Sequence, residues 1–430
     1  MGSVAGVWRL PGVFIVINFL FLFITSKLMT VNSTVRYHLL LVQYLILAET
    51  LFVLVTRSLY NRIVDKWPRQ SKTGFILRMM LAPVFILGQS QMLLHVVLVA
   101  TEPKLLSLIT GYTFGFLMYL IAAVIVVEVL YHVGLIIRNK SLISIVTQVK
   151  TDAQERVMIT VTLLLSCVCF YFGMRNSSFP DVVRVRVPIH NLPASFNNTV
   201  IVQLSDMHIG VVNGRSSLEK VVKIANSLKP DLIAVTGDTA EGGVSKIRHA
   251  LEPLRNLRAK FGVYITTGNH DYYTAEIDNL IEMWQSEGLV VLHNRKVSVK
   301  NSRNDVLQLV GIDDTEGKFF RGDHHGPHYD EALMDRDPNA PTILLSHRPS
   351  VSKKAMTNYG NIQLALSGHT HGGQFPLSGL FHYLSEPYFK GLYKFDKYSY
   401  VYVSTGVFFW AAPLRLFHKG EITHITLLKA

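Results

Sequence analysis

The stretch LALSGHTHGGQ, residues 364–374, places two histidines two positions apart between glycines, directly after an apolar run. On a helix, His369 and His371 would point in different directions. On a loop that leaves a β-strand, both side chains can converge on one point, as the ligands of a metal do. One His-x-His pair is weak evidence for a metal site, so the question is whether the rest of the chain supplies further ligands.

The residues around this stretch alternate short β-rich runs with polar helical segments. Residues 175–198 form a linker and a first strand, and residues 199–430 then contain the apolar runs TVIVQL, DLIAVT, GVYITT, LQLVGI, TILLS, IQLALS, YVYVS and ITHITLL. Between several of them lie helical segments such as RSSLEKVVKIANSLK and TAEIDNLIEMWQSEGL. The alternation predicts an α/β domain, and the close spacing of the late strands predicts a mixed sheet.

Polar residues collect at the carboxyl ends of five of these strands, where open α/β sheets place their sites. The blocks are Ser205-Asp206-Met207-His208, Gly237-Asp238, Gly268-Asn269-His270-Asp271, His347 and Gly368-His369-Thr370-His371. Each block alone is more typical of a turn or a solvated histidine. Five together, each with Gly or Ser beside the ligand, predict a metal site. Carboxylate, imidazole and amide ligands without thiolate suit Mn, Fe, Zn, Ni or Mg.

The blocks D-x-H, GD, GNHD, H and GHTH, in this order, resemble the calcineurin-like metallophosphoesterase superfamily over about residues 199–428. The pair GHTHGGQ and GNHDYY, joined to an apolar N-terminal half, is similar to its transmembrane members, which are related to bacterial YkuE-like phosphoesterases. The resemblance implies a four-layer α/β sandwich, with two mixed β-sheets flanked by helices, and a site for two divalent metal ions.

The resemblance also implies a role for each matching residue. One metal would be held by Asp206, His208 and His371, and the other by Asn269, His347 and His369, with Asp238 bridging both. His270 would contact the phosphoryl oxygen or protonate the leaving group, and Asp271 would orient His270. Because every ligand position is filled, we expect an active enzyme.

The expected reaction is hydrolysis of a phosphate monoester or diester. Two metals clamp the attacking and leaving oxygens and lower the pKa of a bridging water, so a metal-bridged hydroxide attacks phosphorus in line. His270 would act as the general acid. Arg348 is either a phosphate-binding group or a surface arginine, and Asp313 and Asp314, which follow another strand, either line the site or form a turn.

Residues 1–174 contain long runs that are nearly free of charge, in a chain that is 49% apolar with a mean hydropathy of +0.28. A membrane-spanning helix needs about 20 apolar residues. Five stretches qualify, which predicts an uncleaved multi-pass membrane region: about 11–31, 38–56, 79–100, 107–137 and 157–174. The two cysteines, Cys167 and Cys169, both lie in the last stretch and define no disulfide framework.

The net charge of +12 is concentrated in the loops between these stretches. With five spans, eleven Lys and Arg residues fall on the side of the N-terminus and three (Lys27, Arg36 and Lys104) on the other. Positive loops stay in the cytoplasm, which predicts an extracellular or lumenal catalytic domain. Sequons at Asn176 and Asn197 lie on that side and predict a glycoprotein.

Other functions stay open from the sequence. The domain can be an inert docking module, or an accessory domain of a transporter, for which Glu49, Glu128 and His132 at membrane depth are the support. The domain sequence has no basic stripe with interleaved aromatic residues, so the sequence does not predict nucleic-acid binding. The aromatic segments 375–395 and 406–417 are either a lipid-facing lip, which would make the substrate lipid-linked, or core packing.

Overall fold

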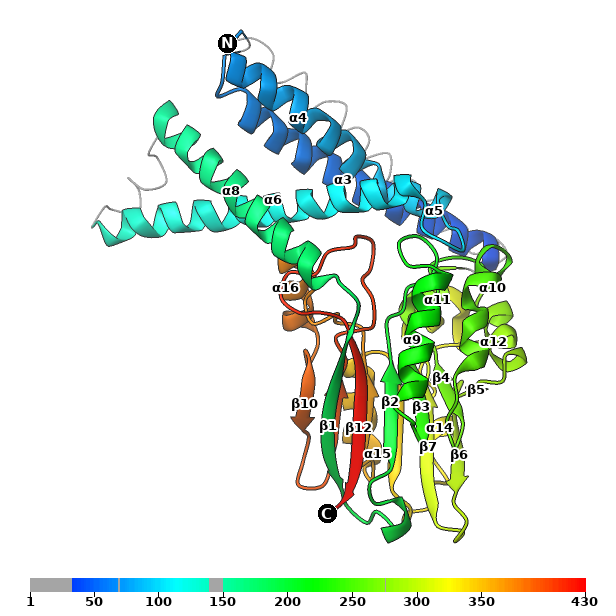
Figure 1. The fold of residues 1–430 in the computed structure, drawn as a ribbon. Helices are drawn as coiled ribbons and strands as arrows, with labels where there is room; N and C mark the ends of the chain where they lie inside the picture. Colours follow the sequence, from blue (N-terminus) through cyan, green and yellow to red (C-terminus); the bar gives the residue numbers. More distant parts are fainter. Residues whose placement is uncertain (1–32, 69, 139–149, 275) are drawn as a thin grey trace.

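The computed structural model describes residues 33–68, 70–138, 150–274 and 276–430. The first expected span, 11–31, lies outside these residues. Helices of the N-terminal half form one layer of the molecule, and an α/β domain lies beneath it (Figure 1). The helices of this layer are α3 (Ser33–Val64), α4 (Lys72–Gln89), α5 (Gln91–Val97), α6 (Leu105–Ile137) and α8 (Asp152–Asn176).

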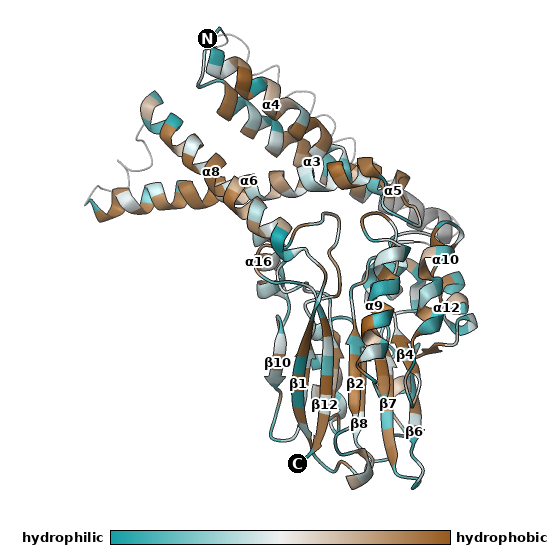
Figure 2. Ribbon diagram, in the orientation of Figure 1, coloured by the Kyte–Doolittle hydropathy of each residue, from teal (hydrophilic) through white to brown (hydrophobic). Residues whose placement is uncertain are grey.

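Two of the helices in the described part of the chain, α6 and α8, are long and apolar enough to cross a membrane. The stretch expected as one span at 79–100 is divided, because α4 ends at Gln89 and α5 begins at Gln91. The helices pack through a buried apolar cluster centred on Leu117 and Leu120 of α6. Gly88 allows α4 to approach α6, since a Cβ there would lie 2.6 Å from a methyl carbon of Leu117. In Figure 2, hydrophobic residues (brown) occur along these helices, interrupted by hydrophilic ones (teal).

Glu128, the charged residue within the apolar helix α6, has a structural explanation. Glu128 forms ion pairs with Arg62 of α3 and with Lys150 at 2.5 Å, and the ring of His132 lies farther away, at 3.8 Å. Glu128 therefore joins neighbouring segments of the helical layer, and its charge no longer needs a transport function to explain it.

The domain contains two mixed six-stranded sheets. The first has the order β1-β12-β2-β3-β4-β5, in which only the β12–β2 pair is antiparallel. The second has the order β10-β11-β9-β8-β7-β6, with antiparallel pairs at its two edges. Their bounds are β1 Asp181–Ile189, β2 Val200–Leu204, β3 Leu232–Thr236, β4 Val263–Thr266, β5 Val290–Val291, β6 Arg295–Lys300, β7 Val306–Ile312, β8 Thr342–Ser346, β9 Leu364–Ser367, β10 Gly391–Lys394, β11 Tyr400–Val403 and β12 Glu421–Lys429.

The two sheets pack face to face through a buried apolar cluster that includes Ile201, Leu309, Leu345 and Leu366. Helices cover the outer faces through two further clusters. The sheets flanked by helices confirm the predicted α/β class, and all eight apolar runs form strands. The helices and 3₁₀ turns of the domain are η1 Ala194–Phe196, α9 Arg215–Ser227, α10 Val244–Leu251, η2 Glu252–Asn256, α11 Asn269–Tyr273, α12 Ile277–Ser286, α13 Glu316–Arg321, η3 Gly322–His324, α14 Tyr329–Leu333, α15 Pro349–Tyr359 and α16 Pro376–Ser385.

The helical layer is docked on the end of the domain where the parallel strands finish (Figure 1). The backbone N–H of Ala100 donates to the carbonyl of Gly210 at 2.8 Å, and that of Arg215 donates to Thr101 at 2.9 Å. Segment 406–417 packs against α6: a Cβ at Gly115 would lie 2.3 Å from a methyl carbon of Leu414. Of the two aromatic segments, this one therefore serves the core packing between the halves.

Candidate metal centre

The predicted ligands lie together at the carboxyl ends of five central strands. Because these strands are neighbours in the two sheets and end at the same edge, their following loops meet at one place. Asp206 and His208 follow β2, Asp238 follows β3, Asn269 follows β4, His347 follows β8, and His369 and His371 follow β9. All seven side chains are at least about nine-tenths buried.

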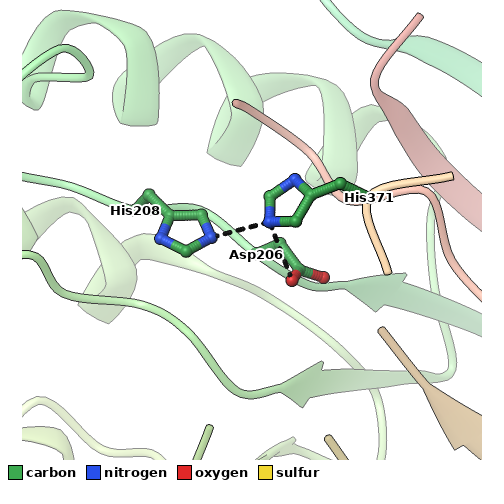
Figure 3. A group of neighbouring side chains, drawn as sticks. All are labelled: Asp206, His208 and His371. Carbon is green, nitrogen blue, oxygen red and sulfur yellow. Dashed lines mark hydrogen bonds and ion pairs between the residues drawn. The ribbon is translucent and has the colours of Figure 1, made fainter. Parts of the chain in front are cut away.

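Three of the side chains converge as Figure 3 shows. The Nε2 atoms of His208 and His371 are 3.0 Å apart, and Nε2 of His371 lies 3.3 Å from Oδ1 of Asp206. Beside them, Nε2 of His347 lies 3.1 Å from Oδ2 of Asp238, and Nδ1 of His369 lies 2.8 Å from Oδ1 of Asn269. Asp238 is also 3.7 Å from Nε2 of His208, so its carboxylate lies between the two groups.

The imidazole of His347 tests whether these residues suit a metal. Its Nδ1 lies 2.8 Å from the carbonyl oxygen of Thr236, which can only accept, so Nδ1 carries the proton. Its Nε2 is buried and lies 3.1 Å from Oδ2 of Asp238; burial lowers the pKa of His347, but the carboxylates of Asp238 and Asp206 outweigh burial and raise that pKa to about 10, so Nε2 holds a proton toward Asp238 when no metal is bound. A backbone acceptor on Nδ1 is typical of histidines that bind metals, and a divalent metal would take the place of the Nε2 proton. The donor set therefore fits a divalent metal.

The backbone of the ligand loops is unusually contorted. Five of the seven residues adopt left-handed backbone angles: φ is 55° at Asp206, 44° at His208, 53° at Asp238, 72° at His369 and 51° at His371. Such a conformation costs a non-glycine residue of the order of 1–3 kcal/mol and is concentrated at functional sites. The packing of the two sheets must therefore hold these loops in place.

Two glycines beside the proposed ligands are required by close approach and not by backbone angle. A Cβ at Gly268 would lie 2.2 Å from Oδ1 of Asp238, and a Cβ at Gly368 would lie 2.0 Å from Oγ of Ser205. Both distances are far below van der Waals contact. Glycine at these positions lets the ligand loops pack directly against one another.

His270 lies beside the ligands and points at a different partner. Its Nδ1 is 2.9 Å from Oε1 of Glu241, and its ring meets that of His208 edge to face. Burial lowers the pKa of His270, but the carboxylates of Glu241 and Asp238 outweigh burial and raise that pKa to about 9. The imidazole is thus held as a proton donor at the edge of the centre.

The expectation that Asp271 orients His270 is wrong. Its carboxylate instead accepts hydrogen bonds from the backbone N–H groups of Asp238, Thr239, Ala240 and Gly268 at 2.8–3.2 Å. Asp271 is fully buried at the start of α11 and faces these donors, whereas Nδ1 of His270 faces Glu241. Its structural effect is to hold the loop that carries Asp238.

Glu241 is the functional residue that sequence reasoning missed. Besides His270, it contacts Nδ1 of His208 through Oε1, and its Oε2 lies 3.0 Å from Nε2 of His95 in α5. The available signal was its place three residues after Asp238, in GDTAE, but a glutamate on a loop is usually solvated. The contact with His95 brings the N-terminal half to the edge of the centre.

Arg348 is neither a free phosphate ligand nor a simple surface arginine. Its Nε lies 3.0 Å from Oδ2 of Asp314, and its Nη2 lies 3.0 Å from Oε1 of Glu316. Asp314 therefore neutralises Arg348 beside the centre. Asp313 belongs to a different cluster, described below.

Comparison with known proteins gives the class of this site. Residues 199–373 match the calcineurin-like phosphoesterase family. The chain is 34% identical over 415 residues to the transmembrane protein with metallophosphoesterase domain of Danio rerio, covering 93% of this chain and 92% of that protein. It is 33% identical to the Bos taurus protein of the same description, over 88% and 86% of the two chains. It is 33% identical to the uncharacterized metallophosphoesterase YkuE of Bacillus subtilis (strain 168), over 55% and 81%.

The chain therefore belongs to the calcineurin-like phosphoesterase family and is a metal-dependent phosphoesterase, a hydrolase that acts on ester bonds. Within that family, its similarity to the transmembrane relatives extends over 93% of its length and so includes most of the N-terminal helical half.

Proposed function

We propose that the protein is a membrane-anchored hydrolase of phosphate esters that uses two divalent metal ions. Asp206, His208 and His371 would hold one ion, and Asn269, His347 and His369 the other, with Asp238 shared. The observation that carries this proposal is the position of buried His347, whose Nδ1 faces the carbonyl of Thr236 and whose Nε2 faces the carboxylate of Asp238. When bound, two metals supply an activated water and neutralise the charge of the phosphoryl group.

The remaining residues position groups and move a proton. His270 would donate a proton from Nε2 to the departing oxygen, because its Nδ1 is fixed by Glu241. Asp271 would act on the Asp238 loop through the backbone N–H groups that it accepts. Burial of the centre excludes bulk water and strengthens these electrostatic contacts.

The test compares two Asp→Asn variants of the full chain purified in detergent. Asp238→Asn removes the charge of the shared ligand, so we expect metal content and turnover of aryl phosphate esters to fall together. Asp335→Asn is the matched control, because Asp335 also has a positive φ, 56°, but is exposed and precedes β8, at the end of that strand opposite to His347. Full activity in the metal-stripped protein would contradict the proposal.

We also infer that the domain lies outside the cytoplasm. The end of α3, the start of α4 and the start of α8, which carry basic residues, lie at the upper left of Figure 1, away from the domain, and α6 ends at the far left. There Lys66 pairs with Asp152 and Glu155, and Arg62 pairs with Glu128. If that basic side faces the cytoplasm, the domain faces the outside or a lumen. Asn197 is the exposed sequon, whereas Asn176 ends α8 and donates to the carbonyl of Leu416.

We propose that the phosphate ester is lipid-linked, and helix α16 supports this. It lies beside α6, and its outer face exposes Leu380, Phe381, Tyr383 and Leu384 by 56–76%. Its inner face reaches the centre, where the rings of His382 and His369 are 5.1 Å apart. A cavity of about 360 Å³ runs between α16 and the loop after His371, lined by Gly372, Gly373, Leu380, Phe389 and Phe417 among others. Acyl chains would occupy this apolar surface while the phosphate reaches the metals.

A further inference from the structure

A second cluster of metal-ligand side chains lies outside the centre described above. It consists of His293, which follows β5, Asp313, which follows β7, and His325, which follows η3. One ligand atom from each lies within 4.8 Å of the other two. The phosphoesterase chemistry uses none of the three, and segments far apart in the chain bring them together.

Asp313 is the buried core of this cluster. Its side chain is fully buried, and it accepts hydrogen bonds from Oγ1 of Thr267 at 3.2 Å and from the hydroxyl of Tyr272 at 3.1 Å. The same Oδ2 atom that faces Tyr272 contacts Nδ1 of His293 and lies 3.9 Å from Nδ1 of His325. Three possible ligand atoms therefore converge on one point, at the boundary between buried Asp313 and the partly exposed ring of His293.

The contacts of His325 indicate which of its two ring nitrogens carries the proton. Its Nε2 lies 3.1 Å from a carboxylate oxygen of Asp278, which can only accept, so in the neutral ring Nε2 carries the proton. Nδ1 then turns a lone pair toward the carboxylate of Asp313, and the Tyr272 hydroxyl, 3.3 Å away, has one proton for both acceptors. A carboxylate on the far nitrogen of an imidazole is the arrangement that orients histidine ligands of metals.

We propose that His293, Asp313 and His325 bind a further divalent transition metal of the Zn²⁺ class. Two imidazole nitrogens and one carboxylate oxygen are a common ligand set for such ions, with bonds of about 2.0–2.2 Å. The rings of His293 and His325 are neighbours, with centroids 4.9 Å apart, and Nδ1 of His325 lies 3.9 Å from Oδ2 of Asp313, a separation that two ligands of one ion can have. Binding requires the His293 ring to move away from Asp313, because their direct contact leaves no room for an ion between them. The exposed edge of His293 leaves a path for the ion and a fourth position for water.

The metal would hold the turn that carries catalytic groups. Thr267 and Tyr272, which donate to Asp313, stand on either side of Gly268-Asn269-His270-Asp271. A cation on Asp313 therefore fixes both ends of the turn that presents Asn269 and His270. A protonated His293 paired with Asp313 is the competing arrangement, and it needs neither metal nor the Nδ1 lone pair of His325.

The test is metal stoichiometry in the full chain, stripped with chelator, reloaded with Zn²⁺ and desalted. We expect His293→Gln and His325→Gln each to hold one Zn²⁺ fewer per chain than the wild type, and Asp313→Asn to do the same. His249→Gln is the matched control, because His249 forms a histidine–glutamate pair at 2.9 Å on the surface and should leave the count unchanged. Co²⁺ absorption gives an independent readout, since ligand loss removes the bands of this site alone.

The outcome does not depend on the phosphoesterase centre. If Asp238→Asn loses metal while His293→Gln keeps the wild-type count, the proposed further site is wrong and the catalytic proposal stands. If no variant at the centre loses metal but His293→Gln does, the further site stands and the catalytic proposal is wrong. Thermal unfolding of the stripped variants shows whether they fold. If Zn²⁺ raises the Tm of the wild type and of His325→Gln by the same amount, His293 and Asp313 form only an ion pair and the proposed site is wrong.

Discussion

Replacing Glu241 by Gln tests the network that joins His270 to the centre. The substitution keeps the size of the side chain but removes the charge that faces Nδ1 of His270 at 2.9 Å and also contacts His208. The side chain of Glu241 is only 7% exposed, so water cannot replace the lost interaction. A buried hydrogen bond between charged groups contributes about 1.5–3 kcal/mol, which corresponds to about a 10- to 150-fold loss of turnover.

The assay is turnover at saturating metal, on one ester with a poor leaving group and one with a nitrophenolate leaving group. Because Glu241 acts through the proton donor, we expect the loss to be larger for the poor leaving group. Glu252→Gln is the control: it removes a Glu–His contact of the same 2.9 Å length, but on the surface at His249. Equal losses on both esters would refute a role through His270, and wild-type turnover would refute the network altogether.

Three further predictions concern the acid, the membrane and the substrate. His270→Ala should keep its metals and lose about 10²–10⁴-fold in turnover of poor leaving groups, and loss of a metal would instead make His270 a ligand. Glycosidase treatment of protein from an animal cell should shift the gel mobility of the wild type and not of Asn197→Gln. A C-terminal tag reached by protease only from the cytosolic side would overturn the orientation. Phe381→Ser/Leu384→Ser should lower the ratio of turnover on vesicle-borne phosphate esters to that on soluble ones by about tenfold, because each side chain loses apolar contact with the bilayer, and an unchanged ratio would remove the lipid-linked substrate.

Experiments on the catalytic domain alone need care for a structural reason. The segment between α5 and α6 pairs with the loop after β2, where Ala100 bonds Gly210 and Thr101 bonds Arg215. His95 also contacts Glu241, and Glu241 in turn contacts the proposed ligand His208. A fragment that begins after α8 loses these contacts, so we expect lower turnover than in the full chain, measured on the same soluble ester.

The sequence by itself determined the class of the domain and the place of its site. Alternating apolar runs specify strands because each must bury its side chains, and ligand residues at strand ends must meet because parallel strands finish at one edge. The strand runs from TVIVQL to ITHITLL could thus be found from local pattern, as could the blocks of polar residues at their carboxyl ends. The proposed metal-ligand role of seven of those residues came from the resemblance to the family and not from their spacing.

Only the tertiary structure decided which side chains touch. Asp271 is adjacent to His270 in the chain but turns to the backbone N–H groups of the Asp238 loop, whereas Glu241, 29 positions before His270, is the residue in contact with it. Similarly, Asp313 has the same sequence context as Asp314, yet one faces two histidines and the other pairs with Arg348. Partner choice depends on directions fixed by the packing of two sheets and a helical layer, and local sequence patterns do not specify those directions.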